Sequence, residues 1–300
     1  MNKLQEKILR LKKEKNAIIL AHNYQELEII EIADYIGDSF ILSKKAQEAN
    51  ADMIVFCGVE FMAESAKILN PSKKVIFPNQ KAGCFMANKI CAEDVRNLRK
   101  EYPKAKIMAY INTTAEVKAE VDICCTSSNA LKVMESLDAD EIIFIPDRNF
   151  AEYLQTKTKK KIIPWTKGYC FLHTNLQPET ILKVRSRHPE GEILMHPETP
   201  LILHKYADHI CGTGGMIKYV EKSDKEVFFI ATESHMCTTL KHLFQEKTFI
   251  PLMRHCTYMG QITLENTLEA LQKEEYEIKL NPETERKARL SLEKMMGISK

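Results

Sequence analysis

The hydrophobic and polar positions of the chain follow the same order three times. An apolar run ends in a polar turn at residues 17–25, 106–114 and 192–200, and a helical pattern follows each turn. A short apolar run then ends at a hydroxyl residue, and a third run ends at an acidic turn. A fourth run ends in a proline, and a loop leads from it to a cysteine. Short β-branched and aromatic runs that alternate with helical patterns predict parallel sheets covered by helices on both faces.

The spacing of these features indicates a threefold sequence repeat. The loop cysteines recur at intervals of 86 residues, and the hydroxyl residues recur at intervals of 88 and 86. The cysteines are Cys84, Cys170 and Cys256. The hydroxyl residues are Ser39, Ser127 and Thr213. Equal spacing of cysteines alone is weak evidence, but four features in one phase across about 240 residues make a repeat the better explanation.

The repeat predicts an α/β fold of three αβα domains, related by a pseudo-threefold axis and each with a short parallel sheet. We expect the domains at residues 1–84, 85–170 and 171–256, with the tail 257–300 packed on the first domain. In open α/β sheets, ligands bind beyond the carboxyl ends of the strands. The polar features described above follow strands, so the axis would bring the turns of all three domains to one central site.

Composition and charge exclude several classes of protein. The chain has 300 residues, of which 44% are hydrophobic and 28% charged, as is typical of a globular protein. Its net charge of +2 gives no reason to expect nucleic acid or an anionic membrane as a partner. Residues 1–16 form a charged amphipathic pattern unlike a signal peptide, and no apolar run reaches the ~18 residues of a membrane span. We therefore expect a cytoplasmic protein.

The cysteines favour a metal site. In a cytoplasmic chain, nine cysteines without a CxxC pair favour metal binding or catalysis over disulfides. Three related thiolates with one open position fit either a catalytic zinc ion or a [4Fe–4S] cluster with one free iron. All-thiolate ligation favours the cluster, whose free iron would act as a Lewis acid. We expect the other six cysteines to be structural.

The turns after the first strand of each repeat supply candidate acid–base groups. They carry His22, Asn23 and Tyr24 in the first repeat, Tyr110 and Asn112 in the second, and His196 and Glu198 in the third. Such groups transfer protons and orient carbonyl or carboxylate substrates. A single histidine after a strand is more often structural, so this hypothesis depends on the alignment of the three turns.

The hydroxyl residues have two interpretations. Ser39, Ser127 and Thr213 precede helical patterns, so each is expected either to cap a helix or to bind an anion at its N-terminus. The segment GTGG at 212–215 adds a backbone that could approach a phosphate, although it matches no nucleotide-binding motif. His173 follows Cys170 by three residues and is placed to reach the same site. These residues together indicate a small anionic substrate and acid–base chemistry suited to condensation and dehydration.

Several motifs resemble those of one known family. The chain resembles quinolinate synthase, the A protein of NAD biosynthesis in bacteria and archaea, in the segments ILAHNYQ, IADYIGDS, FMAESAKILNP, CFMAN, YINTTAE, CTSSNA, PDRNFAEY, HPET and TLENTLEAL. The resemblance covers almost the whole chain. It implies three pseudo-symmetric αβα domains around one [4Fe–4S] cluster held by three cysteines. It also implies that iminoaspartate is condensed with dihydroxyacetone phosphate, with loss of two waters and phosphate, to form quinolinate.

The resemblance further implies a role for each candidate residue. The cluster would be held by Cys84, Cys170 and Cys256. Protons would be transferred by Tyr24 and Glu198, with support from His22 and His196. Substrate carboxylates, phosphate or the product ring would be held by Ser39, Tyr110, Asn112, Ser127, His173 and Thr213. The expected partners are the two small-molecule substrates and an enzyme that produces iminoaspartate, with no nucleic acid or membrane.

Two alternatives use the same three cysteines. One is a zinc-dependent lyase or aldolase, which predicts a colourless protein with one metal ion per chain. The other is a non-catalytic iron–sulfur sensor or electron carrier. A sensor would not need His22, Tyr24, Glu198 or the aligned hydroxyl groups, so their substitution would leave its function intact.

Overall fold

The computed structural model describes residues 1–298, which form three successive α/β units and a helical tail. The first unit contains α1 (Lys3–Glu14), β1 (Ala17–His22), α2 (Leu27–Ile30), β2 (Tyr35–Gly37), α3 (Ser39–Glu48), β3 (Met53–Cys57), α4 (Glu60–Leu69) and β4 (Lys74–Ile76). The second contains η1 (Ala87–Lys89), α5 (Ala92–Glu101), β5 (Lys106–Tyr110), α6 (Ala115–Lys118), β6 (Ile123–Cys125), α7 (Ala130–Glu135), β7 (Glu141–Ile145), α8 (Arg148–Gln155) and β8 (Lys161–Pro164). The third contains α9 (Phe171–Thr174), α10 (Pro178–Arg187), β9 (Glu192–Met195), η2 (Leu201–Tyr206), β10 (His209–Ile210), α11 (Thr213–Lys222), β11 (Val227–Ala231), α12 (His235–Leu243) and β12 (Thr248–Pro251). The tail contains η3 (Met259–Gln261), α13 (Leu264–Lys273) and α14 (Pro282–Ile298).

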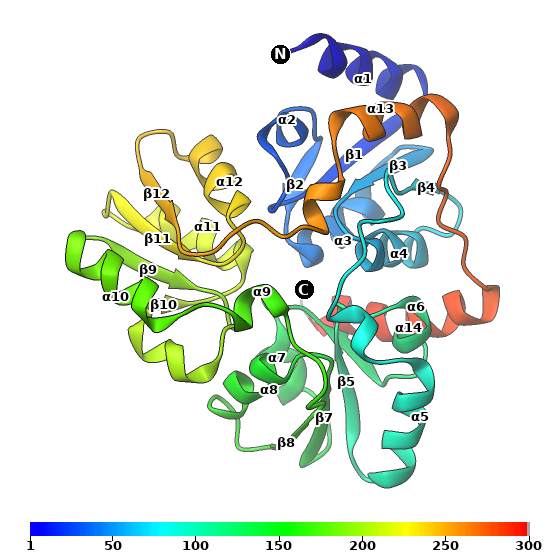
Figure 1. The fold of residues 1–300 in the computed structure, drawn as a ribbon. Helices are drawn as coiled ribbons and strands as arrows, with labels where there is room; N and C mark the ends of the chain where they lie inside the picture. Colours follow the sequence, from blue (N-terminus) through cyan, green and yellow to red (C-terminus); the bar gives the residue numbers. More distant parts are fainter. Residues whose placement is uncertain (299–300) are drawn as a thin grey trace.

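Each unit has one four-stranded parallel sheet, and the three sheets share one strand order. The orders are β2-β1-β3-β4, β6-β5-β7-β8 and β10-β9-β11-β12. Figure 1 shows the three units arranged around a common centre, with the first in blue to cyan, the second in cyan to green and the third in green to yellow. The predicted fold class, three αβα units that each contain a short parallel sheet, is therefore confirmed.

A repeated ion-pair network holds the first strand of each unit. In all three units an aspartate accepts a hydrogen bond of 2.7–2.8 Å from the backbone N–H of an isoleucine in that strand: Asp34 from Ile19, Asp122 from Ile107, and Asp208 from Ile193. The same aspartates pair with a basic residue of the preceding helix: Lys12, Arg99 and Arg185, respectively. The aspartates lie 88 and 86 residues apart, so they repeat in the phase of the cysteines and give independent evidence for the threefold repeat.

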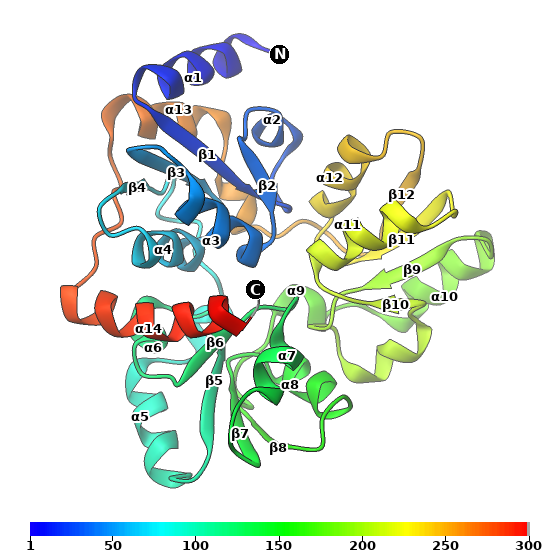
Figure 2. The same ribbon diagram turned by 180° about the vertical axis from the view of Figure 1, so that it is seen from behind.

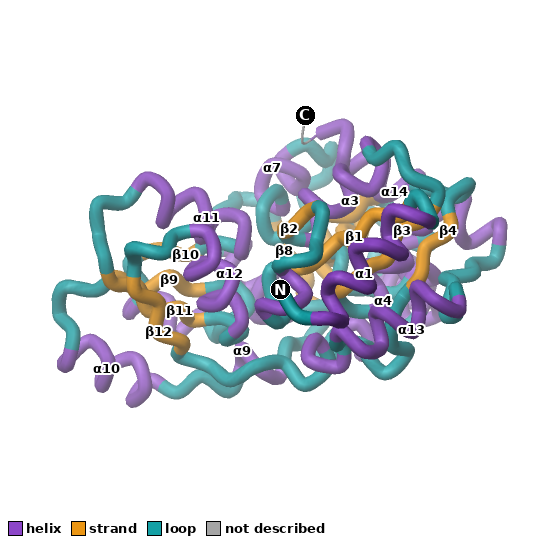
Figure 3. The backbone as a smooth tube through the Cα atoms, turned by 90° about the horizontal axis from the view of Figure 1, so that it is seen from above, coloured by secondary structure: helices purple, strands orange, loops and turns teal. Residues whose placement is uncertain are grey.

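The apolar core differs between the units. Residues of the first unit, the second unit and the tail form one continuous hydrophobic cluster, whereas the third sheet packs a separate cluster on each face. Along β11, Phe229 and Ala231 face one cluster and Phe228 and Ile230 face the other, as the alternation of side chains in a strand requires. Figure 3 shows α10 and α11 on opposite sides of this sheet. Within residues 1–298, no helix combines the length and the apolarity needed to cross a membrane.

The tail contacts two units. Helix α13 packs against α1 and β3 of the first unit, whereas α14 lies against α4 of the first unit and against α6 and β6 of the second. Figure 2 shows α14, in red, crossing between these two units. Arg289 donates to the carbonyl of Ile68 at 2.8 Å, and Ser291 donates to that of Lys118 at 2.9 Å. The boundaries of the three domains stay a prediction.

Candidate active site

A cavity lies where the three units meet. Its walls come from the turns after β1, β5 and β9, from the starts of α3 and α11, and from the loops after β4, β8 and β12. Every residue to which the resemblance gives a role lines this cavity: His22, Tyr24, Ser39, Cys84, Tyr110, Asn112, Ser127, Cys170, His173, His196, Glu198, Thr213 and Cys256. The structure therefore brings the candidate residues of all three repeats together in one place.

Three cysteine loops reach the cavity, one from each unit. Cys84, Cys170 and Cys256 are partly buried, and all nine cysteines of the chain are free thiols. Burial, together with the neighbouring Cys256, raises the pKa of Cys84 to about 12. Burial and Glu198 raise the pKa of Cys170 well above its usual range. The thiols are thus protonated without a metal, and a metal that binds them must displace their protons.

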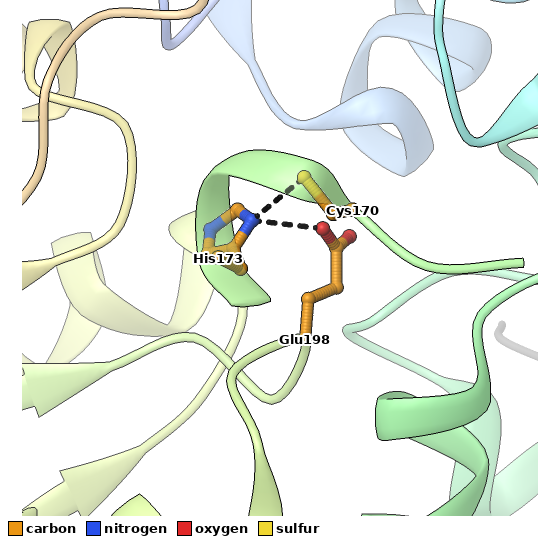
Figure 4. A group of neighbouring side chains, drawn as sticks. All are labelled: Cys170, His173 and Glu198. Carbon is orange, nitrogen blue, oxygen red and sulfur yellow. Dashed lines mark hydrogen bonds and ion pairs between the residues drawn. The ribbon is translucent and has the colours of Figure 1, made fainter. Parts of the chain in front are cut away.

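Cys170, His173 and Glu198 form a compact group on one wall of the cavity. Figure 4 shows the three side chains pointing toward one another, and their ligand atoms all lie within 4.8 Å of one another. Nδ1 of His173 is 3.1 Å from the Cys170 sulfur and 3.0 Å from Oε2 of Glu198. A thiol, an imidazole and a carboxylate are all zinc ligands, so this group could hold a single metal ion.

A chain of hydrogen bonds crosses the cavity wall from the first unit to the second. The hydroxyl of Tyr24 is 2.5 Å from that of Thr232, which is 2.8 Å from Nε2 of His173. The other ring nitrogen of His173 lies beside Oε2 of Glu198, as described above. The hydroxyl of Tyr110 donates to Oε1 of the same carboxylate at 2.7 Å. The two predicted acid–base residues, Tyr24 and Glu198, are therefore connected.

Glu198 and Tyr24, at the two ends of these hydrogen bonds, have different protonation states. Burial raises the pKa of Glu198, but neighbouring imidazoles and the bond from Tyr110 outweigh burial and lower the pKa to about 2. An ionised carboxylate only accepts hydrogen bonds, so Nδ1 of His173 carries a proton and donates it to Oε2. Burial and Glu198 raise the pKa of Tyr24 well above its usual range, so this phenol stays protonated. Glu198 is thus a hydrogen-bond acceptor at one end of these contacts, and Tyr24 is a protonated phenol at the other.

His22 and His196 are neutral. Burial lowers the pKa of His22 to about 3 and that of His196 to about 4. In both residues Nδ1 accepts the backbone N–H two residues further on, from Tyr24 at 3.2 Å and from Glu198 at 3.4 Å. The ring proton must therefore sit on Nε2. Each imidazole thus offers an uncharged hydrogen-bond donor at the cavity wall.

Hydroxyl groups lie at the starts of helices on the cavity wall. Ser39 and Thr213 are the first residues of α3 and α11, and Ser127 precedes α7. The first turns of α3 and α11 carry free N–H groups and a partial positive charge. Asn23, which lies behind the wall, donates to the hydroxyl of Thr213 at 2.9 Å and orients it. This part of the cavity is suited to bind an anion.

The expectation that the hydroxyl residues cap helices is wrong. The N-cap of α3 is Asp38, whose carboxylate accepts the N–H of Ile41, and the N-cap of α11 is Gly212. Helix α7 likewise starts after Asn129. A cap residue precedes the helix with extended backbone angles, whereas Ser39 and Thr213 are already helical. Capping therefore does not explain these hydroxyl groups.

Close packing between units explains two glycines of the GTGG segment. A Cβ atom on Gly212 would lie 2.2 Å from the Ser127 hydroxyl, and one on Gly214 would lie 2.6 Å from Oδ2 of Asp38. Asp38 also accepts a hydrogen bond of 2.6 Å from the Ser128 hydroxyl. Side chains of the first and second units thus approach the third so closely that only glycine fits. The packing explains why glycine stands at positions 212 and 214, so these glycines are not evidence for a phosphate site.

Sequence reasoning missed four polar residues at or behind the cavity. Asp38 and Glu233 line it, and Thr232 and Asp147 lie behind it. Asp147 and Glu233 stand 86 residues apart in the acidic turns that the repeat contains, so their alignment was a usable signal. Thr232 had no such signal, because its partners come from distant parts of the chain.

The other six cysteines lie outside the cavity wall. Three are fully buried in strands: Cys57, Cys124 and Cys125. Cys211 and Cys237 are partly buried, and Cys91 is exposed at the start of α5. Burial raises the pKa of Cys57, Cys211 and Cys237 to about 12. Cys84 has an equally high pKa, so their place outside the cavity wall, and not the pKa of their thiols, sets these cysteines apart from Cys84, Cys170 and Cys256.

Comparison with known proteins gave one consistent result. A family model described as "Quinolinate synthetase A protein" matches residues 6–297. Quinolinate synthase from Methanothermobacter thermautotrophicus is 48% identical over 303 residues, which cover 100% of this chain and 99% of the relative. Quinolinate synthase from Methanocaldococcus jannaschii is 46% identical over 98% of both chains. Quinolinate synthase from Pyrococcus horikoshii is 44% identical over 99% of both chains.

Proposed function

The chain belongs to the quinolinate synthetase A protein family, and from this membership we propose that it is a quinolinate synthase. In the proposed reaction, iminoaspartate and dihydroxyacetone phosphate condense to quinolinate with release of phosphate and two waters. One observation carries the proposal: three cysteine loops, one from each unit, reach a single cavity that also contains the candidate acid–base residues. An electron carrier or sensor would need the cysteines but not those acid–base residues.

The cofactor that we propose is one [4Fe–4S] cluster per chain, held by Cys84, Cys170 and Cys256. When bound, such a cluster supplies a Lewis-acidic iron that has no cysteine ligand. At least one pair of the three sulfurs lies more than 4.8 Å apart, which supports a group larger than one ion. Zinc with tetrahedral ligands at about 2.3 Å needs sulfurs about 3.8 Å apart. In the described part of the chain, only Cys170, His173 and Glu198 have ligand atoms within 4.8 Å of one another, so the three cysteine sulfurs do not form such a group.

A zinc-dependent lyase or aldolase is the second candidate. It is favoured by the compact group of Cys170, His173 and Glu198, whose side chains match the ligand types of catalytic zinc sites. Under this alternative His173 and Glu198 would be metal ligands, and neither could carry a proton. The cluster proposal leaves both free for proton transfer, in agreement with the hydrogen bonds from Thr232 and Tyr110. Metal analysis that finds one zinc ion per chain and no acid-labile sulfide would support the zinc enzyme.

We assign the binding of substrate anions to two groups of residues on the cavity wall. The starts of α3 and α11, with Ser39, Ser127 and Thr213, offer hydroxyl and backbone N–H donors for a phosphate or a carboxylate. Asn112, in the turn after β5, offers an amide donor for a substrate carboxylate or the product ring, and the hydroxyl of Tyr110 would turn from Glu198 to such a group. His22 and His196 are neutral donors that hold an oxygen without adding charge. His173 also lines the cavity and is placed to contact a bound substrate.

We assign the proton transfers to Tyr24 and Glu198. Each loss of water requires that a proton leaves the substrate and that another reaches the departing hydroxyl group. Glu198, an ionised carboxylate, takes up the first proton, and Tyr24, a protonated phenol, delivers the second. Nδ1 of His173 already carries a proton and cannot take one from Glu198, so Glu198 and Tyr24 regain their starting protonation states by exchange with water when the product leaves.

The proposed reaction defines the partners. They are the two small substrates and an enzyme that supplies iminoaspartate, since an imine of this kind hydrolyses in water. The cytoplasmic location expected from the composition agrees with such a metabolic role.

A direct assay tests the function. Protein purified without oxygen and supplied with iminoaspartate and dihydroxyacetone phosphate should form quinolinate, which chromatography separates from both substrates. The Cys170→Ala variant should form none. A wild-type protein with an intact cluster and no quinolinate, or a fully active Cys170→Ala variant, would contradict the proposal.

A further inference from the structure

The same backbone hydrogen bond ties every cysteine loop to its own unit. In each loop, the carbonyl two residues before the cysteine accepts an N–H from the turn that follows the third strand of the unit. The bonds are Glu60 to Ala82 at 2.9 Å, Arg148 to Gly168 at 3.0 Å, and Ser234 to Arg254 at 3.3 Å. The three loops are therefore attached to their units in an equivalent way.

Two of the loops have a second attachment that the first lacks. The backbone N–H of Cys170 donates to Oδ2 of Asp147 at 3.0 Å, and that of Cys256 donates to Oε1 of Glu233 at 2.8 Å. The aligned residue of the first unit is Val59, 88 residues before Asp147, and its side chain has no polar atom. Asp147 and Glu233 are both 0% exposed. Burial of a carboxyl group is costly, so two buried carboxyl groups at matching positions call for a specific role.

Each carboxylate is itself held in place. The second oxygen of Asp147 accepts the N–H of Phe150 at 2.8 Å and caps α8. The second oxygen of Glu233 accepts the backbone N–H of His235 at 2.7 Å, and its first oxygen also accepts Nδ1–H of this histidine at 3.0 Å. One oxygen of each carboxylate is thus fixed by the turn, and the other reaches the cysteine. Each side chain therefore restrains the loop that carries the cysteine of its own unit.

We propose that Asp147 and Glu233 are positioning residues that hold Cys170 and Cys256 in the arrangement required to bind the cluster. This inference rests on the proposed function, because it assumes that these cysteines bind a cluster. The carboxylates bond to the backbone of the cysteines and leave the sulfurs free for the metal. Hydrogen-bond partners of metal ligands typically change metal affinity by about 10- to 100-fold. The Cys84 loop, which has Val59 at the matching position, relies on its backbone bond.

Two substitutions separate this role from ordinary structural roles. In Asp147→Ser, the serine hydroxyl can still cap α8, because serine is a preferred N-cap residue, but it is too short to reach both partners. In Glu233→Gln, one oxygen becomes an amide NH₂, so either the Cys256 N–H or the His235 N–H loses its acceptor. Asp122→Ser is the matched control. It also removes a carboxylate that accepts a backbone N–H in the second unit, but Asp122 contacts the first strand and no cysteine.

The measurement is the rate of cluster loss. Metal-free protein is reconstituted with ferrous iron and sulfide without oxygen, a chelator is added, and the decay of visible absorbance is followed. We expect Asp147→Ser and Glu233→Gln to lose the cluster about 10- to 100-fold faster than the wild type, and Asp122→Ser to lose it at the wild-type rate. Thermal unfolding of the metal-free proteins identifies a variant that fails to fold, and the other variant then decides the question.

The results also separate this inference from the proposed function. A wild-type protein that holds a cluster, together with folded variants that hold it equally firmly, overturns the role of Asp147 and Glu233 alone. A wild-type protein that binds no cluster overturns the cofactor proposal, and the positioning role with it. Equally fast loss from all three variants also overturns the inference, because it would reflect general destabilisation.

Discussion

The hydroxyl of Tyr24 and the carboxylate of Glu198 are the two ends of one chain of hydrogen bonds that passes through Thr232 and His173. Tyr24 belongs to the first unit, and the other three residues belong to the third. The chain is therefore complete only when these two units are in contact. The hydrogen bonds connect an ionised carboxylate, Glu198, with a protonated phenol, Tyr24, in one buried cavity.

Tyr24→Phe should lower the rate of quinolinate formation strongly and leave the metal content unchanged. The substitution removes one hydroxyl group and keeps the ring, so packing is preserved, but the proposed proton donor is lost. A missing acid–base group typically costs about 10²- to 10⁴-fold in rate. Steady-state kinetics with iron analysis measure both effects. The control is Tyr219→Phe, which removes a phenol bonded to Glu192 outside the cavity wall. Full activity of Tyr24→Phe would remove this residue from the mechanism.

Thr232→Val should interrupt the chain without touching either end. Valine has nearly the shape of threonine but no hydroxyl group, so Tyr24 and Nε2 of His173 would both lose a partner. Loss of one buried hydrogen-bonding group costs about 1–3 kcal/mol, which corresponds to a fall in kcat of about 10- to 100-fold. Thr267→Val, a buried threonine beside Cys57, is the matched control. If Thr232→Val retains the wild-type kcat, the hydrogen bonds of Thr232 to Tyr24 and His173 do not contribute to catalysis.

Gly212→Ala should destabilise the contact between the second and third units. The added Cβ would lie 2.2 Å from the Ser127 hydroxyl and 2.9 Å from its Cβ, and a side chain this short cannot swing away. Overpacking of this kind costs about 1–3 kcal/mol. Denaturant unfolding measures the loss, and Gly260→Ala, whose Cβ would meet no atom within 4 Å, should be neutral. Equal stability of the two variants would show that the units do not pack this closely.

A surface ion pair should make the stability of the tail contact depend on pH. Hydrogen bonds from Lys15 and Lys74, each 2.5 Å long, lower the pKa of Glu274 from 4.5 to about 2. Because the pKa is lower in the folded chain, the stabilisation is present above pH 4.5 and is lost as pH falls from 4.5 toward 2. The carboxylate is about one-third exposed, so the effect should be below about 1 kcal/mol.

Comparison of Glu274→Gln with the wild type across this range measures the effect. The variant should be less stable than the wild type at pH 7, and the difference should shrink as the acid form of Glu274 takes over. Glu275→Gln, at an exposed neighbour, serves as the control. A difference that grows on acidification would contradict the assigned direction of the pKa shift.

The sequence repeat was sufficient to predict the three sheets and to bring the candidate residues to one cavity. Strand-to-helix turns at the carboxyl ends of parallel strands must face one edge of the sheet, and the common phase then makes the three edges meet. Ser39 and Thr213 were located correctly by this argument, although their relation to the helices was not. Whether a hydroxyl lies at the cap or one residue inside a helix depends on a single pair of backbone angles, which periodicity does not determine.

Partners that come from different units were beyond prediction. Thr232 matters because Tyr24 and His173 approach it, and neither is near it in sequence. Helix α14 crosses from the first unit to the second because its apolar side has surface to cover on both, and its pattern in the sequence does not identify that surface. Asp147 and Glu233 could have been predicted, because their acidic turns repeat in phase with Cys170 and Cys256.

The central claim is that the three repeats deliver Cys84, Cys170 and Cys256 to one shared cluster. The most direct test is the iron and acid-labile sulfide content, with a visible spectrum, of protein purified without oxygen, beside the Cys170→Ala variant. We predict a brown wild-type protein with about four irons and four sulfides per chain, and loss of both from the variant. A colourless protein with a single zinc ion, or a cluster that persists without Cys170, would contradict the claim.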